Sequence, residues 1–178
     1  MTIRVAIVII FLTTISCKVE TERTTEVTDC KPYFTFDKVE YYSILIREDS
    51  VFDLEQKESK TIEENRLIEL LIGNAPEDIS DTSKLLNLEI LGFKKREIQK
   101  NKFDELDKIF CERKHTQEIY TTCIAVYRDI LIFKNINKTI GFARLCFDCG
   151  DSIITGTDLN KLAFGQSGDI QKLGILLN

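Results

Sequence analysis

Six cysteines and a single histidine are the residues of this chain that could carry covalent or metal chemistry. The sharpest local motif is Cys146-Phe-Asp-Cys149, which Gly150 follows. A Cys-x-x-Cys pair serves as a redox dithiol when it opens a helix, because the helix N-terminus lowers the thiol pKa. The residues after Cys149 are poor helix formers, which weakens that interpretation. Haem attachment is excluded because Gly150 stands where a histidine is needed.

Zinc binding is a second interpretation of the same motif, and it requires a second pair of ligands. Cys111 and His115 are four residues apart at the end of a predicted helix, so they could share a face and complete a site with Cys146 and Cys149. This Cys-x3-His spacing is common by chance. His115 also lies in a polar run, which is typical of an exposed residue.

Structural disulfides are the third interpretation, and an exported chain would favour them. If two strands fold back on each other about Ile136, Cys123 falls opposite about position 149. We therefore expect Cys123, Cys146 and Cys149 to lie close together and two of them to be able to bridge. Cys30 is expected to lie far from this cluster. Five cysteines follow Cys17, so at least one is free or pairs between molecules.

The first 16 residues have the organisation of a secretory signal peptide: Arg4, an apolar stretch from Val5 to Ile15, and the small residue Ser16. The stretch is too short for a spanning helix, which needs ~20 apolar residues. The tetrad 14–17, Thr-Ile-Ser-Cys, resembles the lipobox of bacterial lipoproteins, although a threonine stands where that family usually has leucine. The resemblance implies that Cys17 is acylated and becomes the mature N-terminus. It also implies a lipid-anchored location at the outer membrane or cell surface, facing the periplasm or the exterior.

The composition after the signal predicts a tether and one domain. Residues 17–30 comprise the lipidated cysteine and a flexible tether rich in Thr and Glu, without aromatic residues. Residues 31–178 have the length of a single domain.

The net charge is −5, and removal of the signal, which contains one charged residue, would leave −6. Such an acidic chain is not expected to bind nucleic acid.

Hydrophobic periodicity predicts the elements that position the cysteines. Strands are expected at 34–47, 120–133, 139–147 and 153–155, the second and third forming a central hairpin at 120–147. Helices are expected from the capping box Thr61 to Glu64, from 82 to 91 with Asp81 as cap, after Asn101, and from Ser167-Gly-Asp. A strand at 88–98 competes with the second helix. The composition of residues 48–55 predicts an acidic loop. The order of elements predicts a single α+β domain in which three to four helices pack on an antiparallel sheet.

The charged residues of the hairpin and the absence of catalytic motifs favour a non-catalytic role. Arg128 and Asp129 should point to opposite faces of their strand, and we expect Arg128 to pair with a neighbouring strand. No nucleophile elbow, zincin, P-loop or dinucleotide motif occurs. With its tether and cysteine-bearing hairpin, the chain resembles small lipoproteins of Bacteroidota, a resemblance that brings no activity with it. We expect an envelope module that binds a protein partner, of which an immunity factor against a secreted toxin is one form. The alternative is a zinc-binding or thiol-redox protein centred on the Cys-x-x-Cys motif, for which zinc would be the cofactor.

Overall fold

The computed structural model, which describes residues 30–113, 122–162 and 164–178, is built around a five-stranded antiparallel sheet. The strand order is β3-β2-β5-β6-β7. The bounds of these strands are β2 Lys38–Ser43, β3 Lys94–Glu97, β5 Asp129–Asn135, β6 Lys138–Cys146 and β7 Asp151–Thr155. Two short strands, β1 (Lys31–Pro32) and β4 (Cys111–Glu112), form a separate antiparallel pair. The predicted α+β class with an antiparallel sheet is confirmed.

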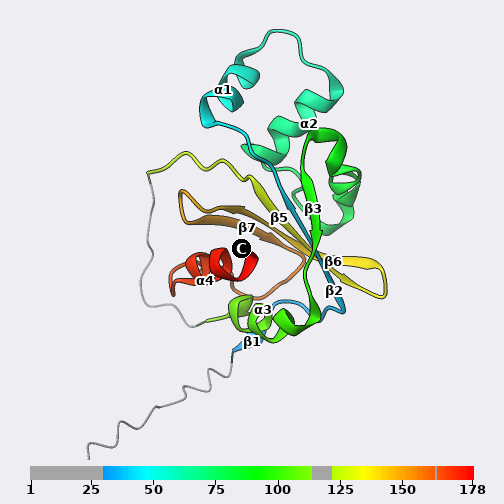
Figure 1. Cartoon of the computed structure of the whole chain (residues 1–178), viewed down its shortest axis with the longest axis vertical. Coiled ribbons are helices and arrows are strands. Elements are labelled where there is room, and N and C mark those ends of the chain that lie inside the picture. Colours follow the sequence, from blue (N-terminus) through cyan, green and yellow to red (C-terminus); the bar gives the residue numbers. More distant parts are fainter. Residues whose placement is uncertain (1–29, 114–121, 163) are drawn as a thin grey trace, which may run out of the picture.

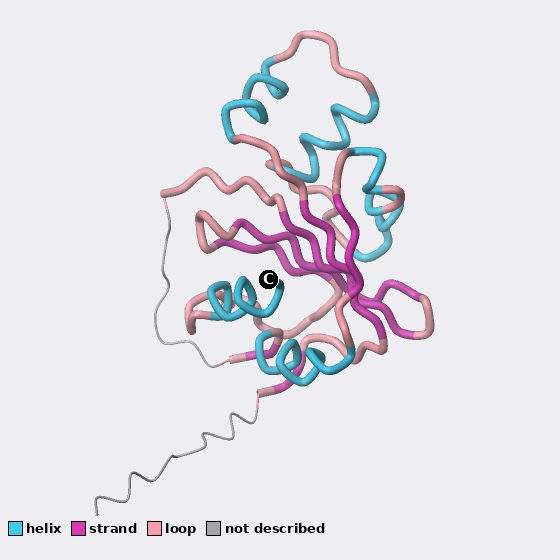
Figure 2. Tube along the Cα trace, in the orientation of Figure 1, coloured by secondary structure: helices cyan, strands magenta, loops and turns pink. Residues whose placement is uncertain are grey.

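Helices cover both faces of the large sheet, so the described chain has three layers (Figure 1 and Figure 2). One face is packed by α1 (Glu48–Gln56), α2 (Ile62–Leu71) and the 3-10 helices Ile79–Leu85 and Leu88–Leu91. The other is packed by α3 (Phe103–Ile109), which follows the short 3-10 helix Lys100–Lys102, and by α4 (Asp169–Leu177). Among the described residues, none of these helices has the length and apolarity needed to cross a bilayer.

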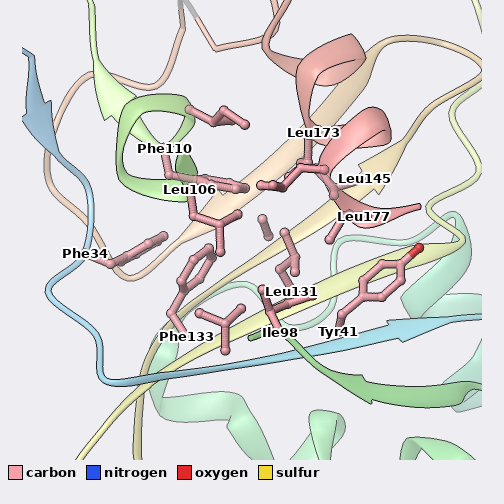
Figure 3. Packing of buried hydrophobic residues seen from close by; sticks show 14 of the residues in the cluster. Phe34, Tyr41, Ile98, Leu106, Phe110, Leu131, Phe133, Leu145, Leu173 and Leu177 are labelled. Atoms are coloured by element: carbon pink, nitrogen blue, oxygen red, sulfur yellow. The ribbon is translucent and has the colours of Figure 1, made fainter. Parts of the chain in front are cut away.

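The alternation of side chains along the central strands divides the core into two clusters. In β5, Leu131 and Phe133 face α3 and α4, whereas Ile130 and Ile132 face α2. This is the period of two that a strand buried on both faces requires. Figure 3 shows the first cluster, in which Leu106 of α3, Phe110 directly after it, and Leu173 and Leu177 of α4 meet the sheet residues Leu131, Phe133 and Leu145.

Gly141 makes room for an aromatic ring on the surface of β6. The Phe34 ring stacks on Phe133 with ring centroids 4.5 Å apart. A Cβ atom at position 141 would lie 2.1 Å from an atom of that ring. A side chain at this position would therefore displace Phe34 from the first cluster.

Local signals in the sequence predict several boundaries well. The capping box is present, since the Thr61 side chain accepts from the Glu64 N–H and the Glu64 carboxylate accepts from the Thr61 N–H. The predicted turn between β5 and β6 is also confirmed. Its residues Ile136 and Asn137 have φ of 48° and 62°, which is the backbone of a tight two-residue hairpin turn. Gly92 ends its helix with φ of 94°, and Phe93 folds back into the core as expected.

The prediction of an acidic loop at 48–55 is wrong, because residues 48–56 form α1. Glu48 and Asp49 occupy the first turn of this helix, where the dipole favours negative charge. Val51 is fully buried against the second cluster. Nine residues with a single buried anchor give too weak a periodic signal to reveal a helix in the sequence.

The single helix predicted at 82–91 is also wrong. Two 3-10 helices replace it, and Asp78 rather than Asp81 caps the first by accepting from the Ser80 N–H. The competing strand at 88–98 is right only in its second half, where β3 lies. The strand predicted at 34–47 is real but shorter, since β2 spans Lys38–Ser43.

The predicted hairpin strand at 120–133 begins later than expected. Its first two residues lie outside the described part of the chain, and 122–128 are not in the strand. Here the chain turns towards α2, and the Tyr127 N–H donates to the Leu71 carbonyl at 2.7 Å. Val126 is buried in the second cluster. The apolar composition of this segment therefore reflects packing against a helix rather than strand pairing.

A charge cluster spans the neighbouring strands β3, β2 and β5. Glu40 is 3% exposed, and its carboxylate binds the ammonium groups of Lys95 and Lys134 at 2.9 and 2.7 Å. Lys38 lies 3.5 Å from the same carboxylate. Burial alone would raise the pKa of Glu40, but the hydrogen bonds and charges of Lys134 and Lys95 outweigh it and lower the pKa to about 2.

We predict that Ile132→Ala lowers the free energy of unfolding by about 2–5 kcal/mol, because Ile132 is buried between the sheet and the second cluster. Urea denaturation measures the loss. Ile175→Ala, at an exposed position of α4, is the matched control and should change stability by no more than about 0.5 kcal/mol. Equal effects of the two changes would contradict the assignment of β5 to the core.

We predict that Glu40 contributes acid-dependent stability. A glutamate in the unfolded chain has a pKa of about 4.3, above the folded value, so the contribution is full above that pH and is lost as pH falls through about 2. Urea midpoints measured between these pH values should therefore fall less for Glu40→Gln than for the wild type. Glu58→Gln, which removes an exposed glutamate, should keep the wild-type profile. If the urea midpoints of all three proteins fell in parallel with pH, the prediction would be wrong.

Candidate functional site

Four of the cysteines form two disulfides. Cys123 bonds to Cys149 with Cα atoms 5.7 Å apart, and Cys30 bonds to Cys111 with Cα atoms 5.6 Å apart. Both separations are usual for disulfides. The first is the pair that mirroring the hairpin about Ile136 brings together, although Cys123 itself lies outside the strand.

Cys30, expected to lie far from the cluster of Cys123, Cys146 and Cys149, bonds to Cys111, which is not part of that cluster. The pairing of β1 with β4 sets Pro32 opposite Cys111 and so brings the two cysteines together. These strands have two residues each. Strands that short have no detectable periodicity, so this bond could not be predicted from the sequence.

The four predicted zinc ligands do not form one set in the described chain. Cys111 and Cys149 are in different disulfides, and a disulfide sulfur cannot act as a thiolate ligand. Cys146 is a free thiol buried in the core, and His115 lies outside the described residues. Residues 30–113, 122–162 and 164–178 hold no group of three or more His, Cys, Asp or Glu side chains arranged for a metal.

The Cys-x-x-Cys motif spans the end of β6 and the turn that follows it. Cys146 is the last residue of β6 and lies opposite Asp151 of β7, whereas Cys149 lies in the turn. The motif therefore does not open a helix, and its two sulfurs have different environments: one is in the core and the other is bonded to the exposed Cys123.

A buried arginine holds this end of the sheet to α2. Arg144 is fully buried in β6, and its Nη1 donates to the carbonyls of Glu69, Leu70 and Gly73 at the end of α2. Its guanidinium lies over the Tyr127 ring, 5.0 Å from the centroid. Burial lowers the pKa of Arg144 to about 10.

Tyr127 extends this network to β7. Its hydroxyl donates to the Asp151 carboxylate at 3.0 Å. Burial and the charge of Asp151 raise the pKa of Tyr127 above its ordinary value. The first residue of β7 is thereby fixed to the segment that Cys123 anchors.

A groove of about 600 Å³ runs beside β7. One wall consists of residues 150–154, which include most of β7. The other consists of residues 159–162 and 164–166, in the loop that leads to α4. The lining combines the polar side chains of Asp151, Lys161 and Asn160 with the apolar ones of Leu159 and Phe164.

Several hydrogen bonds hold the loop wall of the groove in place. Tyr33 donates its hydroxyl to the Asn160 carbonyl at 3.0 Å, and the Asn160 N–H donates to the Glu112 carboxylate at 2.9 Å. Burial, with the charge of Asp169 next in size, raises the pKa of Tyr33 to about 12. The Gly165 N–H donates to Asp169, the first residue of α4. The groove is thus bounded by a braced loop on one side and a paired strand on the other.

Arg128 and Asp129 have separate partners, as expected, but Arg128 precedes β5 and its partners lie in loops beside β2 and β6 rather than in a neighbouring strand. Arg128 donates to the Ile46 carbonyl, just beyond β2, and binds Asp148 at 2.8 Å. Asp129 instead accepts from the Tyr41 hydroxyl. The two side chains therefore bind different neighbours, and neither lines the groove.

The chain matches no family model, no curated protein and no solved structure.

The groove beside β7 cannot be predicted from the sequence, because it depends on how a loop without periodicity lies beside the edge of the sheet.

We predict that the Cys30–Cys111 bond contributes more stability than the Cys123–Cys149 bond. The bonds close loops with sequence separations of 81 and 26. Chain entropy then gives about 4.5 and about 3.5 kcal/mol respectively. Urea denaturation of the paired Cys→Ser variants measures both losses, and peptide mapping after alkylation identifies the bonds. A larger loss from removing Cys123 and Cys149, or a mapped bond that includes Cys146, would contradict the prediction.

Proposed function

We propose that this chain is an envelope lipoprotein, anchored by an acyl group on Cys17, whose α+β domain is a non-catalytic module that binds a protein partner. The location proposed is the outer membrane or the cell surface. The signal-like residues 1–16 and the lipobox-like tetrad at 14–17 are the sequence features behind the anchor. Both lie outside the described residues.

The observation that carries the proposal is the use of the six cysteines. Four are joined in two disulfides and Cys146 is buried in the core. Paired cysteines are typical of proteins exposed to an oxidising compartment. The only other cysteine of the chain is Cys17, directly after the apolar stretch, where acylation would use its thiol.

The groove beside β7 supports the binding part of the proposal. It is concave, it contains both apolar and polar groups, and braced elements form both of its walls. Pre-formed concave sites of this size are where proteins usually bind ligands. The acidic charge of the chain suits a basic partner, and an immunity protein against a secreted toxin is one form of such a module.

We predict that Cys17→Ser abolishes membrane anchoring without unfolding the domain. The wild-type chain should enter the detergent phase of a two-phase partition, and the variant should enter the aqueous phase or stay unprocessed, because acyl chains provide the anchor. Mass spectrometry of the N-terminal peptide detects the acyl groups. Cys146→Ser is the control and should partition as the wild type does. A wild-type chain found in the aqueous phase would rule out the lipoprotein proposal.

A further inference from the structure

We propose that the groove beside β7 binds an extended peptide segment, which adds a sixth strand to the sheet and places a carboxylate near Lys161. The inference rests on the proposed function and specifies it, since it gives the binding module a site and its partner a chemistry. The partner contributes a stretch of about five residues, because β7 has that length.

The outer edge of β7 is the first observation that supports strand addition. In the strand order β3-β2-β5-β6-β7, strands β3 and β7 are terminal, and within residues 30–113, 122–162 and 164–178 the pairing partner of β7 is β6 alone. A terminal strand presents backbone N–H and C=O groups on its outer side, and another extended backbone is the chain geometry that can pair with them in series.

The two edges of the sheet differ in how they are protected. Strand β3 has the sequence Lys-Lys-Arg-Glu and is exposed along its whole length. Charged edge strands of this kind discourage pairing with other chains. Strand β7 has the sequence Asp-Ser-Ile-Ile-Thr, which has high β propensity and no basic residue or proline. Of the two edges, β7 is therefore the one suited to accept a strand.

The loop wall makes this edge a groove with an apolar lining. Leu159 and Phe164 line it and pack against the first core cluster. Leu162 lines the same wall and is 72% exposed. A peptide strand directs alternate side chains to one face, so apolar residues at alternate positions would cover these three side chains.

Lys161 supplies the charge complementarity. Lys161 is one of the residues that line the groove. Among the described residues its ammonium group makes no ion pair, and it donates to the Thr157 carbonyl at 3.3 Å. The other charged side chain in the lining is Asp151, whose carboxylate already accepts from the Tyr127 hydroxyl and the Ser152 N–H. A carboxylate from the peptide, on a side chain or at its C-terminus, would pair with Lys161.

The test uses randomised hexapeptides displayed with free C-termini and the full chain purified in mild detergent. Selected peptides should alternate apolar residues and carry a carboxylate. Each is then synthesised with N-methyl groups on either the odd or the even backbone nitrogens. Strand addition uses every second N–H of the added strand, so one methylation pattern should weaken binding at least about ten-fold and the other should not. Equal effects of the two patterns would overturn strand addition, and so would the failure to select any peptide.

Matched protein variants locate the site. Lys161→Gln should weaken binding about ten-fold, the effect of losing one charge-assisted hydrogen bond. Lys138→Gln removes the same charge at the exposed β5–β6 turn and should leave binding unchanged. Amidating the peptide C-terminus separates a terminal carboxylate from an acidic side chain. Equal binding by the two variants, with unchanged melting temperatures, would overturn the assignment to this groove. The two-phase partition of the Cys17→Ser variant measures anchoring independently of peptide binding. A failure of peptide binding is therefore distinguishable from a failure of the proposed function.

Discussion

The buried guanidinium of Arg144 is the interaction on which the arrangement of the second core depends. It lies near the end of β6, and its Nη1 donates to three carbonyls at the end of α2. The C-terminus of a helix has unsatisfied carbonyls and the negative end of the helix dipole, so it can stabilise a cation that has no carboxylate partner. Stacking on Tyr127 and the bond from Tyr127 to Asp151 continue the contact to β7. Helix α2, the segment before β5, and both strands at this end of the sheet are thus fixed relative to one another. Removing the arginine would leave those helix carbonyls buried without donors.

The sequence predicted the fold where periodicity and capping were strong, and failed where contacts between distant segments decide the structure. The β5–β6 hairpin, helix α3 and the Thr61 capping box all have local signals, and all are present. Helix α1 was missed because one buried valine anchors it. The apolar pattern of residues 122–128 predicts a strand, but this segment packs against α2, a contact that the sequence order does not reveal.

The cysteines show the same division between local and distant information. The bond between Cys123 and Cys149 follows from the geometry of one hairpin, whereas the bond between Cys30 and Cys111 joins residues that are 81 positions apart. The role of Arg144 likewise cannot be predicted from the sequence, because a single charged residue in an apolar strand does not reveal its partners. The groove depends on a loop whose position is set by hydrogen bonds to Tyr33 and Glu112, and neither residue is close to it in sequence.

Each wall of the groove is connected to one of the disulfides, which links the proposed location of the protein to its proposed binding. The bond from Cys123 to Cys149 fixes the turn that precedes β7, and Gly150 of that turn already lines the groove. The bond from Cys30 to Cys111 fixes the residue before Glu112, whose carboxylate holds the opposite wall through the Asn160 N–H. A groove formed in this way is pre-organised, so little conformational entropy is lost when a partner binds. An oxidising compartment would maintain both bonds and with them the shape of the groove. The same cysteine chemistry that suits the envelope therefore also stabilises the surface through which an envelope module would bind its partner.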